Sequence, residues 1–456
     1  MTNTQPLVPS FHATVSQLGN RHICHLERSE KSCVCSDVRR KISRLWLEMT
    51  NYDVVLRRRS KEDGVPRVPL AASAWNQETY REIARAICSG CVIEGDAVQT
   101  LHSQIREMLG VRSVLPCGSG SFALELALSA CGVHHGDEVV IPTFCCSAVV
   151  PPILSVGATP VLADVGDELN ITAETVAAVL TKRTRAVIVP HLFGNPADIQ
   201  PIVELAQCRN ICVIDDAAQA FGAMIGDQPA GSFGNYGVVS FGNEKICRGI
   251  GGGALVSSDE QIRVGKFASP RFIETLRRCL SIMVWNRWRR CPAPISKLSL
   301  SRPDPVALPP AYRRESMANI CAAVAVTLVE RLRENIAARR ERVRAYEKFL
   351  ANEARLKLIP HGPGSACLTQ VVRILRKDRS RDFATELVKA LDAERYEVRG
   401  SYVPLHLIPR LGACVWDRLA HADRVWPDLI ELPCEPSVGF DDVARIAAIT
   451  TELVNA

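Results

Sequence analysis

The sequence has no long apolar segment of the kind that crosses a membrane. No run approaches the roughly 18 uninterrupted apolar residues that a spanning helix requires. The first residues also lack the basic and then apolar pattern of a secretory signal. These absences argue against a membrane-spanning or secreted protein, and the expected location is the cytoplasm.

The sequence also lacks a concentrated basic stripe. The formal net charge is +6, but the basic residues are spread along the chain, so no nucleic-acid partner is expected. Cysteine is not scarce, yet its 18 residues are scattered over 456 positions, unlike a small disulfide-rich domain. The His and Cys residues within 22–35 fit no zinc-finger spacing, so no metal is expected.

The chain divides into segments of different character. Residues 1–60 show no sustained periodicity and are interpreted as a disordered tail, or as sequence upstream of a true start, for which Met49 is a candidate. Residues 66–310 are expected to form a large domain with a variable insertion at about 262–310. Residues 311–456 are expected to form a long helix and a small C-terminal α/β domain.

The insertion contains a basic segment, 277–290, with Trp285 and Trp288. Such a segment could form a helix on a membrane surface. It could equally pack its two Trp on the body of the protein. We favour the second interpretation, because one short segment is weak evidence for membrane binding.

Between about 110 and 260, short runs rich in Val and Ile alternate with helical runs. The strand-like runs are Ser113–Cys117, Glu138–Ile141, Pro160–Ala163, Ala186–Val189, Ile211–Ile214, Gly237–Phe241 and Ala254–Ser257. Buried strands that alternate with helices indicate a mostly parallel sheet covered on both faces. The sequence therefore predicts an α/β fold.

The first candidate site is the segment Gly118–Ala123, between a strand and a helix. Its small residues allow close approach of a phosphate, and the N–H groups at a helix start attract the anion. The segment also fits the G-x-G-x-x-A dinucleotide fingerprint. However, the next strand, Val139–Phe144, ends without the acidic residue that would hold a ribose. This favours a phosphate site over a nicotinamide site.

Two further segments carry reactive side chains. Asp215 and Asp216 end an apolar strand, where a carboxylate could hold a metal, act as a base, pair with a protonated ring nitrogen, or cap a helix. Lys245 lies between a buried strand and the glycine-rich Arg248–Gly253, where a ligand could approach the backbone. A phosphate cradle, a carboxylate and a lysine are together what pyridoxal 5'-phosphate (PLP) requires.

With these sites in order, the chain resembles the DegT/DnrJ/StrS family of sugar aminotransferases over about residues 66–455. That resemblance implies the aspartate-aminotransferase-like fold (PLP fold type I). The motifs that carry it include Gly136–Pro142, Gly157–Asp164, His191–Asp198, Asp216–Ala220, Ser240–Lys245 and Pro404–His406.

The resemblance implies a role for each site residue. Lys245 would bond covalently to PLP, and Asp216 would face its pyridine nitrogen. The implied cofactor contacts are Gly120, Ser121, Phe122, Cys146, Asp216, Gln219, Ser240 and Lys245, and the implied substrate contact is His406. The resemblance also implies a nucleotide-linked keto-sugar as substrate, glutamate as amino donor, and a homodimer.

Two positions depart from the family pattern. Many members stack an aromatic residue on the PLP ring, where this chain has Cys146, a smaller and softer contact. Members often carry an Asn and an Arg, before the Met of the long helix, that reach the neighbouring subunit's phosphate. Neither residue aligns in Tyr312–Met317, so Arg313 or Arg314 is the candidate substitute.

Other functions remain open from the sequence. A PLP-dependent sugar dehydratase would share the fold, but some such relatives replace the lysine with histidine, and this chain keeps Lys245. A non-catalytic regulator with the same fold and a nicotinamide enzyme are the remaining alternatives.

Overall fold

The computed structural model describes residues 68–258, 262, 265, 267–288, 308, 311–375, 382–408, 411, 415–416 and 419–456. All of them belong to the unit Gly64–Ala456. The prediction for residues 1–60 lies outside the described residues.

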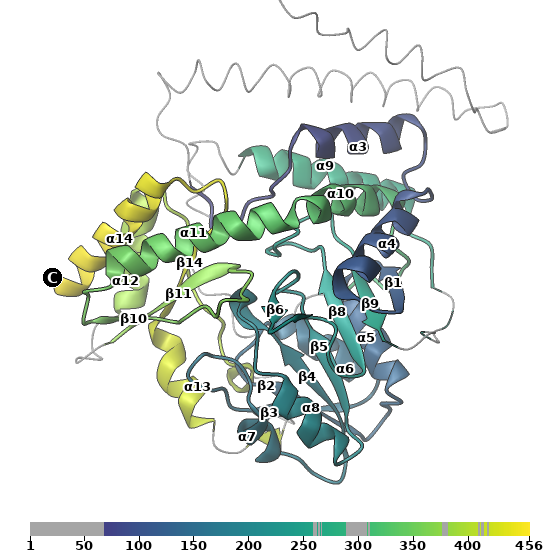
Figure 1. Ribbon diagram of the computed structural model, residues 1–456, viewed down its shortest axis with the longest axis horizontal. Helices are drawn as coiled ribbons and strands as arrows, with labels where there is room; N and C mark the ends of the chain where they lie inside the picture. Colours follow the sequence, from purple (N-terminus) through teal and green to yellow (C-terminus); the bar gives the residue numbers. More distant parts are fainter. Residues whose placement is uncertain are drawn as a thin grey trace, which may run out of the picture. The chain divides into compact units, whose positions relative to one another are not determined.

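The main sheet has eight strands in the order β1-β9-β8-β5-β4-β2-β3-β13 (Figure 1). They span Ser113–Cys117 (β1), Glu138–Pro142 (β2), Thr159–Ala163 (β3), Thr184–Pro190 (β4), Cys212–Asp216 (β5), Tyr236–Ser240 (β8), Gly253–Ser257 (β9) and Val415–Trp416 (β13). Strands β13, β3, β2, β4, β5 and β8 run parallel, and β9 is antiparallel to both β8 and β1. The predicted α/β fold with a mostly parallel sheet is confirmed.

Successive residues of the central strands enter different cores, because side chains of a strand alternate between its faces. In β2, Val139 and Ile141 pack with α5 (Gly120–Ala130) and α6 (Val150–Ser155). Val140 packs on the other face with α7 (Ala173–Ala177) and α8 (Gln200–Gln207). Burial on both faces explains why the sequences of these strands are nearly continuous apolar runs.

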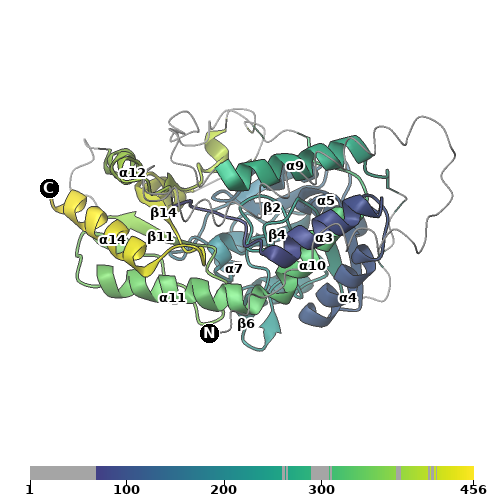
Figure 2. The same cartoon turned by 90° about the horizontal axis from the view of Figure 1, so that it is seen from above.

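Helices α4 (Ala97–Leu109) and α10 (Asn319–Glu330) share a core with residues of β1, β8 and β9. Helix α3 (Gln77–Cys88) lies beside α10 in both views (Figures 1 and 2), and α9 (Phe272–Trp288) contributes Cys279 to the same core. Helix α9 lies within the expected insertion, and the side chains of Trp285 and Trp288 lie outside the described residues. None of the helices in the described ranges is long and apolar enough to cross a bilayer.

The expected long helix is in fact two helices, α10 and α11 (Leu332–Leu350). They are separated at Arg331, whose φ of −104° and ψ of 10° leave the helical region. Periodicity alone did not reveal this break, because buried apolar residues continue at helical spacing across it, from Leu328 through Leu332 to Ile336.

A second, antiparallel sheet lies in the C-terminal part of the chain, in the order β10-β11-β14-β12. Figure 2 shows its two central strands, β11 and β14. Its strands span Leu356–Leu358 (β10), Thr369–Ile374 (β11), Arg399–Gly400 (β12) and Leu429–Pro433 (β14). Helices α11, α12 (Phe383–Ala393) and α14 (Phe440–Asn455) pack on it to form a separate apolar core. The predicted boundary at residue 311 stays a prediction.

A disulfide joins Cys131, which caps the C-terminus of α5, to Cys212, the first residue of β5. It closes a loop with a sequence separation of 81. Helix α5 begins at Gly120, and β5 ends at Asp216. The disulfide therefore joins two elements that each carry a candidate site residue at the end away from the bond.

We expect the double variant Cys131→Ser/Cys212→Ser to lose about 2–4 kcal/mol of unfolding free energy, because the unfolded chain regains the entropy of an open loop. Urea unfolding under non-reducing conditions measures this loss. The matched control is Cys208→Ser, which removes an exposed free thiol close to the same strand and should leave stability unchanged. Equal stability of the double variant and the wild type would contradict the assignment.

Candidate active site

A cavity of about 190 Å³ lies at the carboxyl edge of the main sheet. Seven of the nine predicted site residues line it, namely Gly120, Ser121, Cys146, Asp216, Gln219, Ser240 and Lys245. They come together because parallel strands end at one edge: Asp216 ends β5, Ser240 ends β8, and Cys146 follows β2. Lys245 and Asp216 therefore share one cavity.

The start of α5 forms one end of the cavity. Ser119 caps the helix, its side chain accepting a hydrogen bond from the Phe122 amide at 3.1 Å. At Gly120, an added Cβ would lie only 2.9 Å from Cβ of Ser240, so this close approach requires glycine. Phe122 itself does not line the cavity, and its amide is engaged in capping; its predicted role in phosphate binding stays a prediction.

Arg313 lines this same end, whereas Arg314 does not. The Nε and Nη2 atoms of Arg313 donate to the Gly118 carbonyl at 3.1 and 2.8 Å, and Glu315 lies 3.5 Å from Nε. Burial lowers the pKa of the Arg313 guanidinium, and the nearby charge of Arg278 lowers it further. Arg314 instead pairs with Glu125 at 2.7 Å, with its side chain half exposed.

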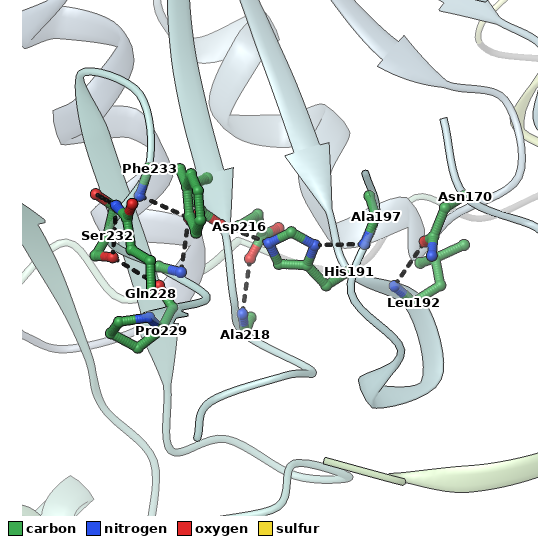
Figure 3. Close-up of polar contacts among 12 residues, drawn as sticks. Asn170, His191, Leu192, Ala197, Asp216, Ala218, Gln228, Pro229, Ser232 and Phe233 are labelled. Carbon is green, nitrogen blue, oxygen red and sulfur yellow. Dashed lines mark hydrogen bonds and ion pairs between the residues drawn. The ribbon is translucent and has the colours of Figure 1, made fainter. Parts of the chain in front are cut away.

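The two carboxylates at the end of β5 point to opposite faces of the sheet. Asp215 is fully buried, and its Oδ1 lies 2.7 Å from Nε2 of His191. Its Oδ2 accepts hydrogen bonds from the amides of Gly231 and Phe233 at 2.7 and 3.0 Å. Nδ1 of His191 accepts from the Ala197 amide (Figure 3), so Nε2 carries the proton that is donated to Asp215.

Asp216 is on the cavity side and has fewer partners. Its Oδ1 accepts from the Ala218 amide at 3.0 Å (Figure 3), the only hydrogen bond its carboxylate makes within the described part of the chain. Burial raises the pKa of Asp216, although the charge of Lys245 opposes that rise. A buried carboxylate with so few partners is suited to pair with a cationic group that enters the cavity.

Gln219 and Cys146 also line the cavity. The Oε1 atom of Gln219 accepts from the Phe193 amide at 3.1 Å, which fixes its side chain. No aromatic residue lines the cavity among the residues described. The nearby rings of Phe193 and Tyr402 stack on each other at 5.8 Å instead.

His406 does not line the cavity. It lies in the short helix Leu405–Leu407, with Nδ1 2.7 Å from Oγ1 of Thr143 and Nε2 2.9 Å from Asp423. Its predicted contact with the sugar stays a prediction.

Sequence reasoning missed the wall residues that carry no reactive group, such as Pro190 and Gly252. Pro190 pairs with Asp216 in the sheet register. Gly252 has a φ of +109° and leaves no room for a Cβ beside Met317. The glycine run was the available signal for the latter, whereas nothing in the sequence distinguishes Pro190.

The fold and this site define an enzyme of the PLP-dependent aminotransferase class. The profile of the DegT/DnrJ/EryC1/StrS aminotransferase family matches residues 74–451, and the chain belongs to this family.

Two relatives and one solved structure are similar to the chain. GDP-perosamine synthase of Caulobacter vibrioides is 29% identical over 394 residues, covering 86% of this chain and 99% of that protein. UDP-N-acetyl-3-dehydro-alpha-D-glucosamine 3-aminotransferase of Acidithiobacillus ferrooxidans is 38% identical over 207 residues, 44% of this chain and 56% of that protein. The structure of the aminotransferase TlmJ from Streptoalloteichus hindustanus has the same fold, with a TM-score of 0.69 and 23% identity over 85% of this chain and 99% of that one.

The contrast between the two acids predicts opposite effects on the protein without cofactor. Asp215→Asn should cost about 2–3 kcal/mol of unfolding free energy, because a buried charge-assisted network is lost. Asp216→Asn should cost nothing or stabilise, because burial raises the pKa of Asp216, so that its ionised form is less stable in the folded protein than in the unfolded chain. Urea unfolding of both variants at pH 7 makes the comparison, and a larger loss for Asp216→Asn would reverse the assignment of the two roles.

Proposed function

We propose that the chain transfers an amino group to the keto group of a nucleotide-linked sugar, with PLP in the cavity and Lys245 as the catalytic residue. The observation that carries the proposal is the shared cavity of Lys245, Asp216 and the start of α5. PLP supplies an electron sink when it is bound. The amine Nζ of Lys245 holds the cofactor covalently and moves protons at the substrate carbon.

The residues at the helix start fit the phosphate of PLP. The glycine at 120 leaves room that a Cβ would fill, and the helix N-terminus favours an anion. Ser121 and Ser240 offer hydroxyl groups, and Arg313 offers the positive charge. We propose that Arg313 replaces the Asn and Arg that many family members carry, and that it contacts the phosphate bound in its own chain.

The other end of the cavity fits the pyridine ring. Asp216 would accept a hydrogen bond from the protonated ring nitrogen. The positive charge of the ring would stabilise the Asp216 carboxylate, which burial alone disfavours. Gln219 and Cys146 would flank the ring. His406 remains our candidate for the sugar.

The names of the relatives support a nucleotide-linked keto-sugar as substrate, since GDP-perosamine synthases and a UDP-sugar aminotransferase are among them. The lysine at 245 favours transamination over dehydration. We further propose glutamate as amino donor, a homodimer, and a location in the cytoplasm.

Lys245→Ala should lower transamination by about two to four orders of magnitude, because the covalent and proton-transfer roles are lost together. The assay incubates the protein with PLP, glutamate and a panel of GDP-, UDP- and dTDP-linked keto-sugars, and detects the amino-sugar by mass. Lys182→Ala, at an exposed lysine, is the matched control. An unchanged rate in Lys245→Ala would refute the assignment.

Arg313→Gln should raise the dissociation constant for PLP by roughly ten- to a hundredfold, because a charge-assisted contact to the phosphate is lost. Arg314→Gln should have little effect, since Arg314 lies outside the cavity wall. Titration with pyridoxal, which lacks the phosphate, provides the second control. If pyridoxal binding weakened as much as PLP binding in Arg313→Gln, the residue would be structural rather than a phosphate ligand.

A further inference from the structure

The residue before the catalytic lysine has an unusual backbone conformation. Glu244 has a φ of +58°, in the left-handed region that a residue with a Cβ rarely adopts. Such a conformation persists only where surrounding contacts hold it. The contacts of Glu244 therefore bear on how Lys245 enters the cavity.

One of these contacts comes from the second sheet. The Nη1 atom of Arg399, in β12, lies 2.7 Å from Oε2 of Glu244. The Nη2 atom of Arg399 lies 3.1 Å from Oε2 of Glu431, in β14. Arg399 and Glu431 are direct cross-strand partners, so the sheet register itself aligns this pair.

The side chain of Glu431 is held in place within the second sheet. Its side chain is only 2% exposed, and it accepts hydrogen bonds from Oγ1 of Thr369 at 3.3 Å and Oγ of Ser401 at 3.4 Å. Arg399 is thus held from one side by buried groups of the second sheet and reaches Glu244 from the other.

We propose that this chain of ion pairs, Glu431–Arg399–Glu244, here named the Arg399 bridge, keeps Glu244 in its left-handed conformation and thereby orients Lys245. Arg399 is a positioning residue in this scheme and touches no reacting atom. The inference rests on the proposed role of Lys245. It also makes the direction of the lysine depend on the second sheet, which is distant in sequence from the lysine loop.

The Glu244–Arg399 pair is partly exposed, with side-chain exposures of 49% and 31%, so its contribution to global stability is small. Its effect should appear locally instead. We expect Arg399→Met to raise the dissociation constant for PLP about fivefold, the upper end for a pair of this kind. Borohydride reduction followed by peptide mass analysis should also trap less cofactor on Lys245 at a fixed PLP concentration.

A double-mutant cycle separates positioning from a structural effect. Asn adopts the left-handed region more readily than Glu and carries no charge, so Glu244→Asn no longer requires the bridge. Arg399→Met should therefore change neither readout when Glu244→Asn is already present. If Arg399 mattered only because its loss leaves the buried Glu431 without a cationic partner, the effect would be equal in both backgrounds, and the proposal would be wrong.

The matched control is Arg445→Met, which breaks a pair of similar exposure with Glu394 at 3.2 Å, also in the C-terminal part of the chain. It should leave PLP affinity and trapping unchanged. Wild-type values of both readouts in Arg399→Met would overturn the proposal while leaving the role of Lys245 intact. Trapping of PLP at another lysine in the wild type would instead refute the proposed function, and the role of the bridge with it.

Discussion

The pleat of β5 turns the carboxylates of Asp215 and Asp216 to opposite faces of the main sheet, and the site depends on this separation. Asp215 is enclosed with His191 and two backbone amides, so its charge is compensated inside the protein. Asp216 faces the cavity with a single amide partner among the described residues. One acid thus stabilises the loop structure beneath the site, and its neighbour stays available for a cationic ligand.

The parallel arrangement of the strands turns this local property into a site. Because β2, β4, β5 and β8 end at the same edge, residues that are distant in sequence converge on one cavity. The start of α5 adds a helix N-terminus, which favours an anion, and the lysine loop after β8 adds the amine. The Arg399 bridge then ties that loop to a sheet built from the last third of the chain.

The sequence predicted the main sheet well, because strands buried on both faces have an apolar signature that hardly depends on context. The sequence did not predict the break at Arg331, since Leu328, Leu332 and Ile336 continue the helical spacing of apolar residues across it. The disulfide could not be predicted, because 18 cysteines allow too many pairings.

Within the site, motifs identified the residues with reactive groups but not their orientation. The choice between Arg313 and Arg314 required coordinates, since adjacent positions differ only in the direction of their side chains. The contact between Arg399 and Glu244 joins residues 155 positions apart, and no local pattern indicates it.

The absence of an aromatic residue from the described cavity wall changes how a cofactor is held there. Cys146, which the family resemblance aligns with a ring-stacking position, lines the cavity, and a thiol offers less contact area than an aromatic side chain. Less of the binding free energy can then come from the flat faces of the PLP ring. In the proposed site, the two charged ends, Asp216 at one side and Arg313 with the start of α5 at the other, would supply a larger share. Cofactor affinity would therefore depend more strongly on the burial and charge of those ends than in a site where an aromatic ring stacks on PLP.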